Sequence, residues 1–149
     1  MASNWDERYM GLAEQVSTWS KDPSAKIGAV AIGVQGQVLA QGYNGFPRGV
    51  LDHEERYLNK EEKYKFVVHA EMNTIYNASY NGISLRGSTL YVYGLPICNE
   101  CAKGIIQTGV TRVVMKYSKE PEKWMNSFEI TKKMFDEANI KYEVISDRN

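Results

Sequence analysis

Apolar side chains recur at helical spacing at the start of the chain, and short apolar runs alternate with this pattern further along. The first stretch predicts an amphipathic helix over 5–20. Asp22 and Pro23 end it, because the residue before a proline disfavours helical geometry. The same reasoning predicts further helices at 70–81, 99–108 and 124–138, and strands at 27–34, 38–43, 89–93, 111–115 and 142–145.

The order of these elements indicates an α/β fold. The first two strands are joined by a short turn at 35–37, which predicts an antiparallel hairpin, and the later strands alternate with helices, which predicts parallel pairing. A length of 149 residues fits one compact domain. We therefore expect residues 1–149 to form a single domain, a three-layer α/β/α sandwich around a five-stranded mixed sheet.

Residues 44–64 break the pattern. This segment contains Gly45, Pro47, Gly49 and a charged run at 52–56, so we expect an irregular connection. A long irregular connection inside a small domain is often functional. The alternative is a surface insertion without a role.

Charge and composition exclude several classes of function. Lysine plus arginine equals aspartate plus glutamate at 18 each, so the net charge of zero gives no attraction towards nucleic-acid polymers or anionic membranes. No apolar run approaches the ~20 residues of a membrane-spanning helix, and the polar N-terminus does not resemble a signal or transit peptide. Two cysteines are too few for a disulfide framework. We expect a cytoplasmic protein.

The strongest chemical pattern combines H-x-E at His69 and Glu71 with C-x-x-C at Cys98 and Cys101. One histidine and two cysteines leave the fourth position of a tetrahedral zinc ion open, as in catalytic sites. His53 would instead complete a closed structural site, and the two cysteines alone would form a redox dithiol. Neither of these alternatives gives Glu71 a task.

The predicted helices place these side chains at helix N-termini. The partial positive charge there stabilises thiolates and carboxylates. If the strands that precede the two helices are neighbours, both helix starts lie at one edge of the sheet, where a metal ion can bridge them.

These motifs resemble those of the zinc-dependent cytidine and deoxycytidylate deaminase family, in which H-x-E is followed by P-C-x-x-C. The resemblance includes 67–75, 98–109, 42–47 and the pair 21–23 and 27–29, and it spans roughly residues 5 to 115. The family's proline directly before the first cysteine is Ile97 here, with Pro96 one position earlier. We expect a loop of different shape there with unchanged ligand spacing.

The resemblance implies a cytidine-deaminase-like fold and hydrolysis of dCMP to dUMP and ammonia. One Zn²⁺ per chain would be held by His69, Cys98 and Cys101 and would supply hydroxide to attack the cytosine ring. Glu71 would carry the protons of the reaction. The resemblance places Asn44 against the sugar, and we also expect Ala70 to bind substrate. Arg48 is expected to hold a phosphate, because it is a cation within the irregular segment.

The resemblance also implies a homo-oligomer, often a hexamer, which dCTP activates and dTTP inhibits, with Mg²⁺ accompanying a triphosphate. A triphosphate requires cations and backbone donors. The expected effector contacts are Lys21, Ser24, Lys26, Tyr43 and Gly45. The alternative is that these loops only connect elements and that their lysines are solvated.

Other functions stay open at this point. A deaminase of cytidine, guanine or a tRNA adenosine uses the same chemistry, although zero net charge disfavours tRNA. A cytidine deaminase usually has cysteine at the position of His69. A zinc-stabilised binding module without catalysis would also explain the three ligands, but not Glu71.

Overall fold

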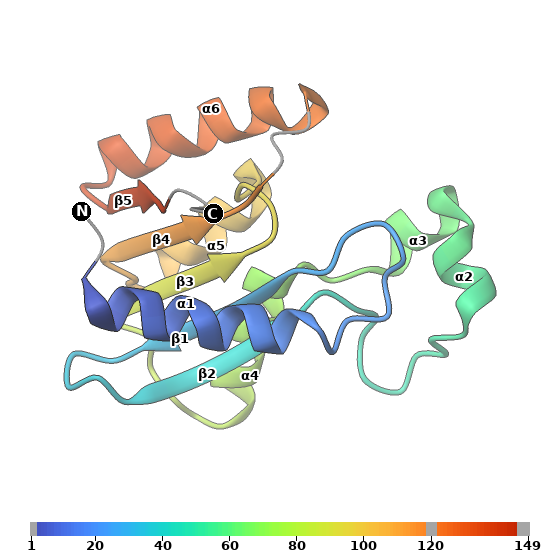
Figure 1. Ribbon diagram of the computed structural model, residues 1–149, viewed down its shortest axis with the longest axis horizontal. Helices are drawn as coiled ribbons and strands as arrows, with labels where there is room; N and C mark the ends of the chain where they lie inside the picture. Colours follow the sequence, from blue (N-terminus) through green and yellow to red (C-terminus); the bar gives the residue numbers. More distant parts are fainter. Residues whose placement is uncertain (1–2, 119–121, 146–149) are drawn as a thin grey trace.

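The computed structural model describes residues 3–118 and 122–145 of the chain (Figure 1). Within these residues, no helix is both long enough and apolar enough to cross a membrane. The helices are α1 (Asn4–Ser17), α2 (Glu54–Leu58), α3 (Lys60–Phe66), α4 (Ala70–Tyr80), α5 (Asn99–Gln107) and α6 (Glu122–Glu137). The strands are β1 (Gly28–Ile32), β2 (Val38–Tyr43), β3 (Thr89–Tyr93), β4 (Arg112–Lys116) and β5 (Lys141–Val144).

A five-stranded mixed sheet in the order β2-β1-β3-β4-β5 forms the centre of the molecule. β1 runs antiparallel to both β2 and β3, and β3, β4 and β5 run parallel. The hairpin and the parallel crossovers that the sequence predicts are therefore confirmed. Because β1 is antiparallel to both of its neighbours, β2 and β3 end at the same edge of the sheet.

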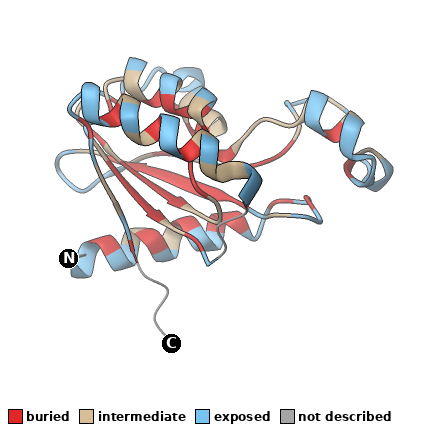
Figure 2. Ribbon diagram, turned by 90° about the horizontal axis from the view of Figure 1, so that it is seen from above, coloured by how far each residue is buried: buried red, intermediate tan, exposed pale blue. Residues whose placement is uncertain are grey.

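Helices cover both faces of the sheet, which confirms the three-layer α/β/α sandwich (Figure 2). Alternate residues of β1 point to opposite faces, as in any strand. Val30 and Ile32 pack against α1 on one face. Ala29 and Ala31 face the second core, which α4, α5 and α6 cover. The small alanine side chains let α4 approach the sheet closely.

The segment at 44–64 is less irregular than the sequence predicts, because it contains α2 and part of α3. Asn59 ends α2 and caps α3, and its side chain accepts a hydrogen bond from the backbone N–H of Glu62 at 3.1 Å. Helices of five and seven residues are too short to show a hydrophobic period. The expectation of a wholly irregular connection is therefore wrong for this part of the chain.

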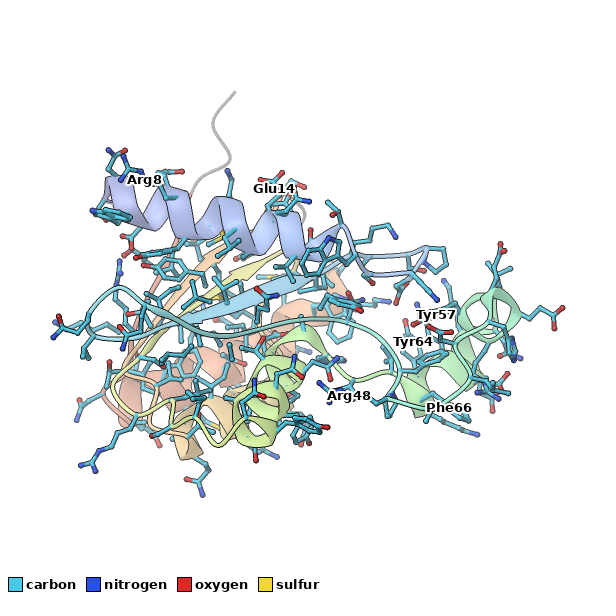
Figure 3. All side chains as sticks on the ribbon, turned by 90° about the horizontal axis from the view of Figure 1, so that it is seen from below. Arg8, Glu14, Arg48, Tyr57, Tyr64 and Phe66 are labelled. Carbon is cyan, nitrogen blue, oxygen red and sulfur yellow. The ribbon has the colours of Figure 1, made fainter. Side chains whose placement is uncertain are left out.

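We call α2 and α3 together, residues 54–66, the arm, because they project from the rest of the molecule (Figure 1). Figure 3 shows Tyr57 and Phe66 on the side of the arm that faces the body. Phe46 of the body stacks on Tyr57 with ring centroids 4.1 Å apart. Lys63 of α3 forms an ion pair with Asp22 at 3.2 Å, and both side chains are almost fully buried. Aromatic stacking and one buried ion pair thus hold the arm.

Lys63→Met is expected to lower the free energy of unfolding by about 3 kcal/mol, because it leaves the buried Asp22 carboxylate without its cation. Chemical denaturation measures this loss. The control is Lys65→Met on the same helix, whose ion pair with Glu61 is exposed and contributes little. Equal stability of the two variants would show that the ion pair with Asp22 does not hold the arm.

Candidate active site

α4 and α5 begin side by side, and the residues at their starts include the predicted metal ligands. His69 is the N-cap of α4, Cys98 is the N-cap of α5, and Cys101 lies in the first turn of α5. Nδ1 of His69 is 3.5 Å from Sγ of Cys98 and 3.3 Å from Sγ of Cys101. The structure therefore brings the three side chains together.

The sheet achieves this in a different way from the one that the sequence suggests. The strands that precede these helices are β2 and β3, and they are not neighbours, because β1 lies between them. Both nevertheless end at the same edge of the sheet, and α4 packs directly against α5. The two helix N-termini meet for this reason.

The spacing of the three ligand atoms fits a zinc ion. All of them lie within 4.8 Å of one another. A tetrahedral zinc ion with bonds of about 2.0–2.1 Å to nitrogen and about 2.3 Å to sulfur holds such a pair about 3.6 Å apart. His53, which would complete a closed site, lies at the start of the arm and outside this group. Three protein ligands are the number typical of a catalytic site.

Hydrogen bonds among the three ligands shift their pKa values. The hydrogen bond with Cys101 lowers the pKa of the Cys98 thiol to about 4. The same bond, together with burial, raises the pKa of Cys101. The hydrogen bond with Cys98 raises the pKa of His69 to about 9, although burial opposes this shift. The ligands thus share protons, and a metal ion that binds here displaces them.

Glu71 lies in the first turn of α4, two residues after His69, and only 4% of its surface is exposed. Burial raises the pKa of its carboxyl to about 7, against the lowering effect of His69. It is not a member of the ligand group. A buried carboxyl beside a metal site and outside the ligand set is suited to carrying protons.

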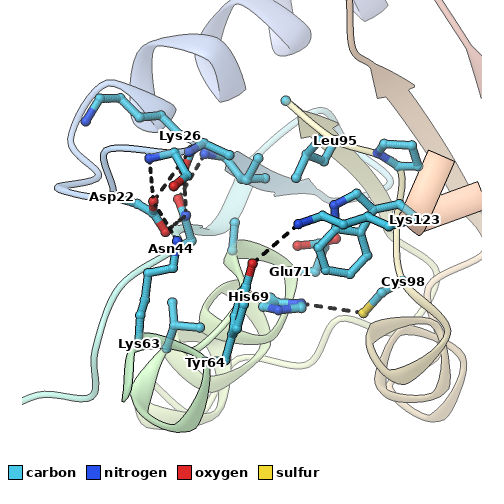
Figure 4. Close-up of a pocket in the computed structure, with 18 of the residues that line it drawn as sticks. Asp22, Lys26, Asn44, Lys63, Tyr64, His69, Glu71, Leu95, Cys98 and Lys123 are labelled. Carbon is cyan, nitrogen blue, oxygen red and sulfur yellow. Dashed lines mark hydrogen bonds and ion pairs between the residues drawn. The ribbon is translucent and has the colours of Figure 1, made fainter. Parts of the chain in front are cut away.

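A cavity of about 330 Å³ opens over these residues (Figure 4). The buried or largely buried side chains of His69, Glu71 and Cys98 form its inner end. The apolar side chains of Ile27 and Leu95 form part of its wall. Exposed lining residues form its mouth: Ser24, Lys26, Tyr64, Ser118 and Lys123. Apolar walls with a few polar groups are typical of a small-molecule site.

Asn44 and Ala70, two of the expected substrate contacts, both line this cavity. Oδ1 of Asn44 accepts a hydrogen bond from the backbone N–H of Ile27, and Nδ2 donates to the carbonyl of Ala25, each at 2.9 Å. Asn44 therefore ties the end of β2 to the connection before β1 and shapes the cavity wall. Ala70 is the first residue of α4, where backbone N–H groups have no acceptor within the helix.

Arg48, the third expected substrate contact, does not line this cavity. Its guanidinium donates to Oδ1 of Asn77 and lies 4.9 Å from the ring centroid of Tyr80. Both partners belong to α4, beside which Arg48 lies in Figure 3. Arg48 lines a second cavity of about 440 Å³, which also includes Trp19.

The five expected effector contacts are divided between the two cavities. Tyr43 and Gly45 line the second cavity. Ser24 and Lys26 line the first. Lys21 lines neither of them. The structure therefore does not bring these five residues together into one site.

Several cationic or polar residues of the first cavity were not predicted from the sequence, among them Lys63, Tyr64 and Lys123. Lys63 and Tyr64 belong to a charged segment, and Lys123 is one of several lysines in the last helix. No local motif marks them, because only the folded chain brings α3 and α6 to the same opening.

Comparison with known proteins agrees with this geometry. Residues 3–117 match the family model for the cytidine and deoxycytidylate deaminase zinc-binding region. The "Probable deoxycytidylate deaminase" of Drosophila melanogaster is 36% identical over 153 residues, covering 94% of this chain and 71% of that protein. The deoxycytidylate deaminase of Pongo abelii is 35% identical over 145 residues, covering 93% of this chain and 78% of that protein.

A solved structure is also similar. The crystal structure of the dCMP deaminase from cyanophage S-TIM5, in complex with dCMP and dUMP, matches with a TM-score of 0.74 at 27% identity. The match covers 97% of this chain and 99% of that chain. His69, Glu71, Cys98 and Cys101 all lie inside the region that matches the family model. This chain therefore belongs to the cytidine and deoxycytidylate deaminase family and is a hydrolytic enzyme.

Proposed function

We propose that this enzyme hydrolyses dCMP to dUMP and ammonia at the first cavity. The observation that carries the proposal is the buried Glu71 carboxyl, which lines the cavity beside the group formed by His69, Cys98 and Cys101. If the protein were a zinc-stabilised binding module or a redox dithiol, the buried carboxyl of Glu71 would have no role. The two unpaired cysteines suit a reducing compartment, so we place the activity in the cytoplasm.

The residues divide the chemistry between them. His69, Cys98 and Cys101 would hold Zn²⁺, which, when bound, supplies Lewis acidity that lowers the pKa of water to about 7. Glu71 takes one proton from the attacking water and gives it to N3 of the ring. It then takes the second proton, from the hydroxyl now bonded to the ring carbon, and gives it to the amino group, which leaves as ammonia. General acid–base catalysis of this kind contributes about 10²–10⁴-fold. Water enters and ammonia leaves, so the reaction is balanced without another cofactor.

The choice of dCMP is supported by the relatives that are named for it and by the cyanophage enzyme solved with dCMP and dUMP. We expect kcat/KM for dCMP to exceed that for deoxycytidine by at least about 10²-fold, because one or two charge-assisted contacts to the phosphate provide that factor. Ammonia release from dCMP, deoxycytidine, cytidine, dCTP and guanine measures it. Equal use of dCMP and deoxycytidine would contradict the proposal. A preference for guanine or cytidine would show that the enzyme deaminates that compound instead of dCMP.

We further propose that the enzyme is a homo-hexamer, activated by dCTP and inhibited by dTTP, with Mg²⁺ accompanying the triphosphate. The second cavity suits a nucleotide better than the loops that the sequence suggests. Trp19 and Tyr43 pack edge to face there, 6.2 Å between centroids, and Arg48 supplies a cation. Asn44 lies between Tyr43 and Gly45 and lines the first cavity, so a ligand in the second can act on it.

If the enzyme is regulated in this way, its rate depends sigmoidally on the dCMP concentration, and dCTP makes this dependence hyperbolic. The coupling free energy between the effector site and the active site is expected to be about 1–3 kcal/mol. Initial rates with each effector, a thermal shift and the mass in solution measure these properties. The control is Lys133→Gln, which should respond like the wild type because Lys133 lines neither cavity. Hyperbolic kinetics that neither nucleotide changes, without a thermal shift, would show an unregulated enzyme.

A further inference from the structure

Among the residues that the structure describes, three lysines line the first cavity, and their partners differ. Lys63 is buried in its ion pair with Asp22. Nζ of Lys26 donates to the carbonyl of Ser20 at 2.5 Å, across the connection that precedes β1. These two lysines therefore hold the fold together. Lys123 is exposed, and it has no carboxylate partner among residues 3–118 and 122–145.

Lys123 meets Tyr64 across the mouth of the cavity (Figure 4). Lys123 belongs to α6 and Tyr64 to α3 of the arm, and Nζ lies 3.4 Å from the phenolic oxygen. The side chain of Tyr64 is 52% exposed. An ammonium group and a hydroxyl at this separation can both donate hydrogen bonds to one anion.

The depth of the cavity decides which part of a substrate reaches this pair. The metal ligands and Glu71 lie at the buried inner end, so the carbon that bears the amino group must lie there. The sugar and its 5′ substituent then point towards the mouth, where Tyr64 and Lys123 stand. A phosphomonoester carries a charge of about −1.5 to −2 at pH 7 and accepts several hydrogen bonds.

We propose that Lys123 and Tyr64 bind the 5′-phosphate of the substrate and thereby select a nucleoside monophosphate over the unphosphorylated nucleoside. This inference rests on the proposed function and adds the residues that determine its specificity. It assigns the phosphate to α6 and the arm instead of to Arg48, whose guanidinium is engaged on α4 outside the cavity. The bound phosphate would join the arm to the body at a further point, in addition to the stacking of Phe46 on Tyr57 and the Lys63–Asp22 ion pair.

Lys123→Gln is the direct test, made on the zinc-loaded enzyme with dCMP and deoxycytidine as alternative substrates. The ratio of kcat/KM for dCMP to that for deoxycytidine is expected to fall by about 10- to 100-fold, mainly through a higher KM for dCMP. Tyr64→Phe removes only the hydroxyl and is expected to lower the ratio by about 3- to 10-fold. Lys123→Arg keeps the charge and should retain most of the preference. The control is Lys133→Gln on the exposed side of the same helix, which should leave the ratio unchanged.

Inhibition by the product gives a second readout that does not depend on turnover of a poor substrate. Lys123→Gln should weaken inhibition by dUMP by the same factor and leave inhibition by deoxyuridine as it is in the wild type. If the wild type prefers dCMP and Lys123→Gln keeps the full preference, the phosphate assignment is wrong and the proposed function stands. If the wild type does not distinguish dCMP from deoxycytidine, the proposed function itself fails.

Discussion

Glu71→Gln is expected to lower kcat for dCMP by at least about 10²-fold while one zinc ion per chain stays bound. Glutamine has nearly the same shape as glutamate but cannot take up or release the protons that the reaction moves. The side chain lies outside the ligand group, so metal binding should not depend on its charge. Steady-state rates together with metal analysis of the same sample measure both quantities.

The matched control for this variant is Glu100→Gln. Glu100 also lies in the first turn of a helix that carries a metal ligand, but it is exposed and pairs with Lys103 on the surface of α5. Its replacement should change neither turnover nor metal content. Loss of zinc from Glu71→Gln would identify Glu71 as a ligand, and unchanged turnover would remove it from the mechanism.

Cys101→Ser is expected to abolish both zinc binding and turnover and to lower the stability of the fold. A serine hydroxyl is a much poorer zinc ligand than a thiolate, and Cys101 is buried, with only 2% of its surface exposed. A metal bound only to the folded state adds its binding free energy to folding. Metal analysis and thermal unfolding, with and without added Zn²⁺, measure the effect. A Cys101→Ser protein with full zinc content and a wild-type melting temperature would contradict the assignment of the ligands.

The sequence predicts the body of the fold well, because strong patterns lie close together along the chain. The short apolar run at 89–93 gives the bounds of β3, and helical spacing gives α4 to within a residue. The order of the strands in the sheet cannot be predicted in this way. The position of β1 between β2 and β3 depends on packing between segments about sixty residues apart, and periodicity contains no information on it.

The arm and the residues at the mouth of the first cavity were not predicted from the sequence, for related reasons. α2 and α3 are fixed by a cap at Asn59 and by contacts to Phe46, not by a hydrophobic period of their own. The pairing of Lys63 with Asp22 joins residues far apart in the chain, and so does that of Tyr64 with Lys123. In a sequence, such lysines cannot be distinguished from solvated ones.

The metal group was predictable because its chemistry is encoded in short spacings at helix starts. H-x-E and C-x-x-C place each pair of residues by local geometry, and the sheet has only to bring two helix ends together. Arg48 was inferred from its nearness to a loop in sequence, and the folded chain turns it towards α4 instead. Spacing within one turn of a helix thus predicts which side chains come together, whereas nearness in sequence along an irregular segment does not.

The most direct test of the central claim follows dUMP and ammonia production from dCMP as zinc is removed and returned. We expect the purified enzyme to contain one zinc ion per chain, to lose turnover in step with zinc removed by a chelator, and to regain it when Zn²⁺ is added back. The His69, Cys98 and Cys101 group would then be the site on which activity depends. Full turnover of dCMP by the zinc-free protein would contradict the account.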